Sequence, residues 1–160
     1  MPEDVRTTLY RLRRGPWGIW IELTAWADVT AGAPARGEPV ADRVWLDTTP
    51  VRAPGPSGGG SRLRADETER LRHGLALGAP AIQDRAAGGH TLVTVHRVVF
   101  PECDYQPEGL TAALLQWLED AFGLPPHPVE ATFDRTTNRY RYDWTPTGAA
   151  EWNPTHDTSN

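Results

Sequence analysis

The sequence of 160 residues contains no lysine, one cysteine and one methionine. A single cysteine excludes an internal disulfide and argues against a cysteine-rich metal site. A phosphate-binding loop of the common type needs a lysine, so the glycines at 58–60 predict a flexible loop instead. No apolar run reaches about 18 residues, which excludes a transmembrane helix. The N-terminus lacks a charged segment followed by an apolar one, so we expect no signal peptide and a cytoplasmic location.

All 16 basic residues are arginine, a bias consistent with a GC-rich genome, and 21 acidic residues give a net charge of −5. The charge is unevenly distributed. Residues 1–64 carry two more arginines than acidic residues, whereas residues 65–160 carry seven more acidic residues than arginines. An acidic chain is a poor general binder of nucleic acid, which is a dense polyanion. Any contact with RNA must therefore come from a local arginine patch.

Hydrophobic periodicity and turn residues predict the elements of the chain. The clearest strand is 19–27, in which aliphatic side chains share one face while Trp20 and Trp26 share the other. The clearest helix is 108–122, whose apolar stripe ends at Gly123. The predicted order is strand 7–13, strand 19–27, strand 44–48, helix 66–77, strand 90–100, helix 108–122 and a hairpin of strands 129–134 and 139–144.

Two amphipathic helices can cover only one face of such a sheet, so the order predicts an α+β two-layer sandwich. We expect a mostly antiparallel sheet of four to six strands in a single domain over residues 1–144. The Pro-, Gly- and Ser-rich segment 50–64 is predicted to be a flexible loop, 30–39 a loop and 145–160 a disordered tail. In the first helix Gly74 indicates close packing, while Gly78 and Pro80 are expected to end the helix.

Three short motifs follow one another on these elements. They are the turn Gly15-Pro16-Trp17-Gly18, the spacing Leu71-x-x-Gly74-x-x-x-Gly78-x-Pro80, and the pair Asp104 and Glu108 at the start of the long helix. Together, over about residues 7–135, they resemble domain IV of translation elongation factor G. The resemblance implies a ribosomal-protein-like fold with a left-handed βαβ crossover, and a non-catalytic surface for ribosomal or other RNA or for a ribosome-associated protein. The chain has no GTPase motif, and its short acidic loop 101–107 lacks the histidine of the family's tip, so the resemblance does not extend to ribosomal translocation.

The most basic local cluster is Arg11, Arg13 and Arg14, which lies beside Trp17. Arginine pairs with phosphate groups and an aromatic ring stacks on bases, so this cluster is a candidate RNA contact. The alternative is an edge strand whose solvated charges discourage aggregation. The loop that corresponds to the family's tip adds three residues to the candidate binding set, namely Asp104, Tyr105 and Gln106.

Trp20 and Trp26 lie on one face of the best strand, and aromatic side chains on an open sheet face are typical of protein-binding surfaces. A second hypothesis is therefore an acidic protein-binding partner, such as an immunity or accessory protein, with an incidental fold. A third is an enzyme of unknown class. The five histidines have no metal-binding spacing, and the sequence predicts no catalytic residue, cofactor or metal site and no membrane partner.

Overall fold

The computed structural model describes residues 5–51, 53–54, 60–61 and 63–145. The main strands are β1 (Arg6–Arg13), β2 (Gly18–Thr30), β3 (Glu38–Ala41), β4 (Val44–Asp47), β7 (His90–Val99), β8 (Glu130–Asp134) and β9 (Arg139–Asp143). The helices are α1 (Ala65–Ala86), α2 (Glu108–Phe122) and the short 3-10 helix η1 (Glu102–Asp104). Much of the predicted loop 50–64, and all of the predicted tail after residue 145, lie outside the described residues. Within that loop, β5 (Ala53–Pro54) and β6 (Gly60–Ser61) pair as antiparallel strands.

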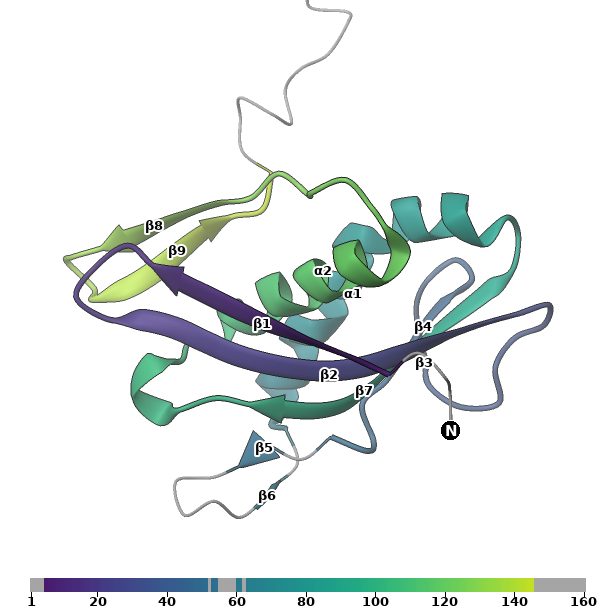
Figure 1. Ribbon diagram of the computed structural model, residues 1–160, viewed down its shortest axis with the longest axis horizontal. Helices are drawn as coiled ribbons and strands as arrows, with labels where there is room; N and C mark the ends of the chain where they lie inside the picture. The colour runs from purple at the N-terminus through teal and green to yellow at the C-terminus, as the bar shows by residue number, and fades with distance from the viewer. Residues whose placement is uncertain (1–4, 52, 55–59, 62, 146–160) are drawn as a thin grey trace, which may run out of the picture.

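Five strands form one sheet in the order β1-β2-β7-β4-β3. Neighbouring strands are antiparallel except β4 and β7, which are parallel and are connected through α1. The two helices lie side by side on one face of this sheet (Figure 1). The predicted two-layer α+β sandwich is therefore confirmed. The predicted closing hairpin does not join the main sheet, because β8 and β9 form a two-stranded sheet of their own.

The alternation of β2 determines which face of the sheet the helices cover. Ile19 and Ile21 are buried beneath α2, and a Cβ atom on Gly109 would come within 2.9 Å of both side chains. Trp20 and Trp26 are half-buried and lie on the opposite face. We call that opposite side the open face. The core below the helices contains Leu23, Val44, Leu71, Leu75, Ile82, Val93, Val95, Leu110, Leu114, Trp117 and Leu118.

Helix α1 continues past its predicted end at residue 77 and contains Pro80. Pro80 is exposed, so the ring lies on the solvent side of the helix, where it displaces no core side chain. Gly78 is buried, and a Cβ atom there would lie 2.9 Å from Leu118, so this glycine permits packing and does not end the helix. The close packing predicted at Gly74 is confirmed, because a Cβ atom there would lie 2.8 Å from the carbonyl oxygen of Thr111 in α2. The motif that resembled a helix end thus lies inside α1.

None of the described helices is long and apolar enough to cross a membrane.

Strand β3 replaces part of the predicted loop 30–39. It has only four residues, including Pro39, and it pairs with β4 across a register irregularity. Such a short, proline-containing strand is stable only because β4 provides a partner for it, and the local sequence gives no alternation to detect.

Candidate functional site

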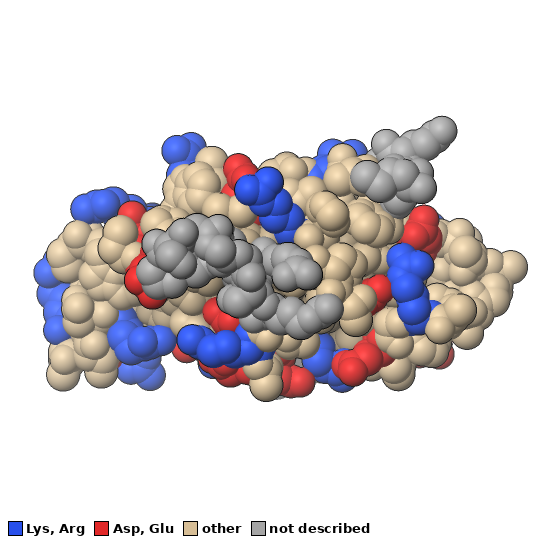
Figure 2. Space-filling model, turned by 90° about the horizontal axis from the view of Figure 1, so that it is seen from below, with Lys and Arg blue, Asp and Glu red and all other residues tan. Residues whose placement is uncertain are grey.

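The β1–β2 turn forms one end of the molecule, and three predicted RNA-contact arginines lie there. In Figure 2 arginine side chains gather at the left end, which in Figure 1 carries this turn and the tip of the β8–β9 hairpin. Arg11, Arg13 and Arg14 are exposed, and none of them forms an ion pair with any residue that the structure describes. By contrast, Arg70 and Arg139 both pair with Glu108. The β1–β2 end therefore presents guanidinium groups that no carboxylate of the described residues neutralises.

Two of these arginines meet two other predicted residues in one hollow on the open face. Arg11 lies opposite Trp20 in the β1–β2 ladder, and both line a cavity of about 220 Å³ with Arg13 and Asp104. Asp104 reaches the cavity from η1 and forms no ion pair with either arginine in the described part of the chain. We call this hollow the tip pocket. It combines an aromatic ring, two cations and one carboxylate.

Arg14 lies on the other side of β1, where it lines a separate hollow with Tyr10 and Tyr142. Burial is the main reason why the pKa of Tyr10 is raised, and the positive charge of Arg14 partly opposes that effect. The structure thus separates Arg14 from Arg11 and Arg13, although all three lie at the same end of the molecule.

Trp17 is engaged within the protein. Its indole N–H donates to the carbonyl oxygen of Asn138 over 3.1 Å, and its ring packs edge-on against Phe133 and Tyr140, with centroids 5.9 and 5.1 Å away. Gly15 allows this arrangement, because a Cβ atom there would lie 2.5 Å from the Phe133 ring. Trp17 therefore attaches the β8–β9 hairpin to the β1–β2 turn.

Tyr105 and Gln106 are also engaged in contacts within the protein. The Tyr105 hydroxyl donates to Glu67 over 2.6 Å, and its ring stacks on Phe100 with centroids 3.6 Å apart. Gln106 is 1% exposed, donates to the carbonyl oxygen of Tyr140 over 2.7 Å and accepts from the Tyr140 backbone N–H over 2.8 Å. Neither residue is among those that line the tip pocket.

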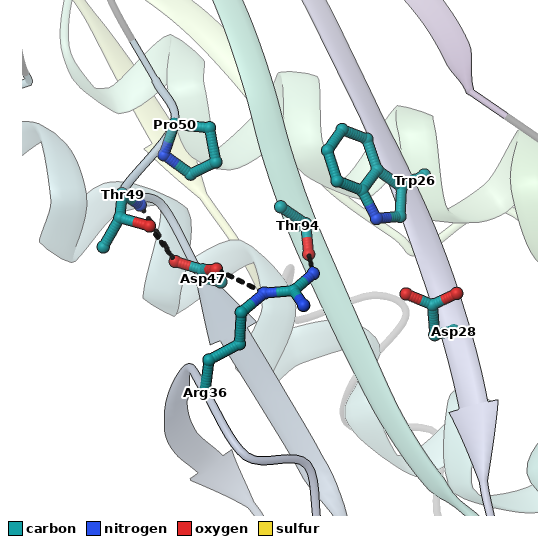
Figure 3. Close-up of a pocket in the computed structure, with 7 residues that line it drawn as sticks. All are labelled: Trp26, Asp28, Arg36, Asp47, Thr49, Pro50 and Thr94. Atoms are coloured by element: carbon teal, nitrogen blue, oxygen red, sulfur yellow. Dashed lines mark hydrogen bonds and ion pairs between the residues drawn. The ribbon is translucent and has the colours of Figure 1, made fainter. Parts of the chain in front are cut away.

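Trp26 lies in a different cavity of the open face, which we call the Arg36 pocket. It has a volume of about 670 Å³. Its lining residues, shown in Figure 3, are Trp26, Asp28, Arg36, Asp47, Thr49, Pro50 and Thr94. Arg36 Nε donates to Asp47 over 2.8 Å, and Arg36 Nη2 donates to the Thr94 hydroxyl over 3.1 Å. The structure therefore places Trp20 and Trp26 on one face but in two separate pockets.

Asp47 is the buried centre of the Arg36 pocket, with only 4% of its side chain exposed. It accepts hydrogen bonds from the backbone N–H and the hydroxyl of Thr49, over 3.0 and 2.8 Å. Burial acts to raise the pKa of this carboxyl group, but the hydrogen bonds from Thr49 and Arg36 outweigh burial and hold the pKa below its usual range. Asp47 is thus a fixed anion that orients Arg36.

Sequence reasoning missed the Arg36 pocket. The only local signal is Asp47 two residues before Thr49, a spacing typical of an aspartate that caps a turn. Arg36 itself gives no signal, because its partners Asp47 and Thr94 follow 11 and 58 residues later. Among the described residues, no three histidine, cysteine or acidic side chains come together as metal ligands would.

No protein-family model matches the chain, and no curated protein sequence matches it. The two pockets and the charges around them are therefore the features that bear on function.

Proposed function

We propose that this chain is a non-catalytic RNA-binding domain similar to domain IV of translation elongation factor G. The observation that carries the proposal is the tip pocket, where the guanidinium groups of Arg11 and Arg13 lie beside Trp20 on the open face. Neither group forms an ion pair within the described part of the chain, and Arg13 Nη2 donates one hydrogen bond to the carbonyl oxygen of Pro16 over 3.1 Å. Guanidinium groups pair with phosphate oxygens, and an indole ring receives an unstacked base. The element order and the α1 crossover between the parallel strands β4 and β7 support the likeness in fold.

Single-stranded RNA suits this pocket better than a duplex does. A cavity of about 220 Å³ accommodates one splayed base and not a helical groove. Asp104 at the rim accepts hydrogen bonds, so it favours a base edge that presents an amino group. Its negative charge also limits how closely the phosphate backbone approaches the rim, and so directs the backbone toward Arg11 and Arg13.

The test compares two double variants that change net charge equally. Arg11→Gln with Arg13→Gln removes the tip cations, while Arg72→Gln with Arg85→Gln removes two cations from α1. Fluorescence anisotropy with a labelled single-stranded RNA is measured at about 50 and about 200 mM salt. Two phosphate contacts on a single strand contribute a slope of about 1.4 in log affinity against log salt, or about sevenfold over this range.

We expect the tip variant to lose that salt dependence and the α1 variant to keep it. Trp20→Leu is expected to weaken binding by about 5- to 150-fold, the range for one stacked base. Equal losses in the two double variants would show that net charge, and not the tip pocket, drives binding. If the unaltered protein binds no RNA at the lower salt concentration, the RNA assignment is wrong.

A second candidate function is protein binding, and the half-buried tryptophans of the open face favour it. Trp20 and Trp26 lie on a sheet face that neither helix covers. Such rings are frequent anchors of protein interfaces. If RNA binding is absent, co-purification of one protein from the native cell, lost on changing Trp20 and Trp26 to Ser, would support this candidate.

A further inference from the structure

The Arg36 pocket is separate from the tip pocket and is not used by the proposed RNA contact. Three adjacent strands of the open face contribute to it: Trp26 and Asp28 come from β2, Thr94 from β7 and Asp47 from β4. Arg36 enters from the β2–β3 connection, and in Figure 3 its guanidinium lies between Asp47 on one side and the β2 residues on the other. The volume of about 670 Å³ falls in the range of small-molecule sites.

Arg36 is held in place before any ligand arrives. Its Nε and Nη2 atoms donate to Asp47 and Thr94, and Asp47 is itself fixed by Thr49. Yet 53% of the Arg36 side chain remains exposed. A guanidinium has five N–H donors, so the donors that these two bonds leave over are available to an acceptor in the cavity. An arginine oriented in this way loses little side-chain entropy on binding a carboxylate.

Asp28 adds a third charge to this cavity, beside the ion pair of Arg36 and Asp47. It is half-buried on β2 and forms no ion pair with Arg36 or with any other described residue. A simple anion would be attracted by Arg36 but repelled by Asp28 and Asp47, and a simple cation would leave the remaining N–H donors of Arg36 without an acceptor. Arg36 and Asp28 together therefore suit a ligand that carries both signs, with its negative group toward Arg36 and its positive group toward Asp28.

Trp26 provides an aromatic surface for the ammonium group and the apolar part of such a ligand. Its indole ring lies beside Asp28 on the same strand face, and His96 supports it from a centroid distance of 5.6 Å. An ammonium group is stabilised over an indole ring, and an apolar side chain packs against the same ring and Pro50.

We propose that the Arg36 pocket binds a free α-amino acid, with its carboxylate on Arg36 and its ammonium group between Asp28 and the Trp26 ring. The ammonium and the carboxylate of such a ligand are attached to one carbon, so one small molecule satisfies both charges. The Arg36 pocket shares no lining residue with the tip pocket. A negative result for amino-acid binding therefore does not affect the proposed RNA binding, and a negative result for RNA binding does not affect the proposed amino-acid binding.

Isothermal titration of the full chain with glycine, L-leucine and L-phenylalanine tests the proposal. N-acetyl-L-leucine lacks the ammonium group and 3-methylbutylamine lacks the carboxylate, so neither is expected to bind. Asp28→Asn is expected to weaken binding by about tenfold or more, since it removes the charge that meets the ammonium group. Glu22→Gln is the matched control, because Glu22 is a half-buried acid on the same face of β2 outside the pocket.

A second readout locates the ligand. In proton–nitrogen correlation spectra, titration is expected to shift the indole N–H signal of Trp26, assigned with the Trp26→Phe variant, and the Nε–H signal of Arg36. The proposal is overturned if none of the three amino acids binds at about 10 mM, which corresponds to less than about 3 kcal/mol of binding free energy. It is also overturned if N-acetyl-L-leucine binds as tightly as L-leucine, or if the Asp28 and Glu22 variants lose equal affinity.

Discussion

Gln106 connects the β8–β9 hairpin to the rest of the protein, and replacing it with leucine tests that role. Leucine is similar in volume but neither donates nor accepts a hydrogen bond. It leaves two backbone groups of Tyr140 without their partners, at a residue that is itself only 3% exposed. Each unpaired buried group costs about 1–3 kcal/mol, so we expect Gln106→Leu to lower the free energy of unfolding by about 2–6 kcal/mol.

The assay is urea unfolding, together with amide hydrogen exchange at Tyr140. Gln83→Leu is the matched control: its side-chain amide donates one exposed hydrogen bond to the carbonyl oxygen of Asp42 over 2.6 Å, and removing it is expected to cost about 1 kcal/mol. The Tyr140 hydroxyl accepts from the Arg14 backbone N–H and donates to the Trp17 carbonyl oxygen, over 2.7 and 2.6 Å. The variant should therefore also loosen the β1–β2 turn. A Gln106 variant as stable as the Gln83 variant, with Tyr140 still protected, would refute the reasoning.

Two further stability predictions follow from packing and from charge. Gly74→Ala gains about 1 kcal/mol of helix propensity, but its methyl group would lie 2.8 Å from the Thr111 carbonyl oxygen. Overpacking costs about 1–3 kcal/mol, so thermal unfolding should show net destabilisation, whereas Gly32→Ala, with no atom within 4 Å of the new methyl group, should not. Asp47→Asn is expected to cost about 2 kcal/mol at neutral pH, measured by urea unfolding. The pKa of Asp47 is lowered in the folded state. The contribution of the Asp47 carboxylate to stability is therefore fully present above the pKa of an unfolded aspartate, about 4, and is lost as the pH falls through the lower pKa of the folded state. A difference between the two proteins that stays constant down to about pH 2 would contradict this reasoning.

The layer architecture could be predicted because it depends on patterns within single elements. In β2 the alternation of small and aliphatic residues with Trp20 and Trp26 separates the two faces without any knowledge of the partner strands. Helix α2 begins and ends where its apolar stripe and Gly123 predict. These signals are local, and the structure contains the strand and the helix that they predict.

What could not be predicted depends on distant contacts. Gly78 and Pro80 do not end α1. Gly78 packs closely against α2, and the ring of Pro80 lies on the opposite, solvent-exposed side of the helix. Trp17 is a candidate base-stacking residue by sequence, but its hydrogen-bond partner Asn138 follows 121 residues later. The Arg36 pocket could not be predicted for the same reason. Its charged residues are far apart in the sequence and come together only when three strands lie side by side.

Both edges of the main sheet are protected against the addition of another strand. At one edge β3 carries Pro39, which lacks a backbone donor, and has an irregular register with β4. At the other edge β1 carries the charged side chains of Arg6, Arg11 and Arg13. A flat, uncharged edge would allow copies of the chain to join through their backbones, and neither edge offers one. A partner of this domain is therefore expected to contact side chains on the face or the tip, so its recognition depends on sequence and not on generic strand pairing.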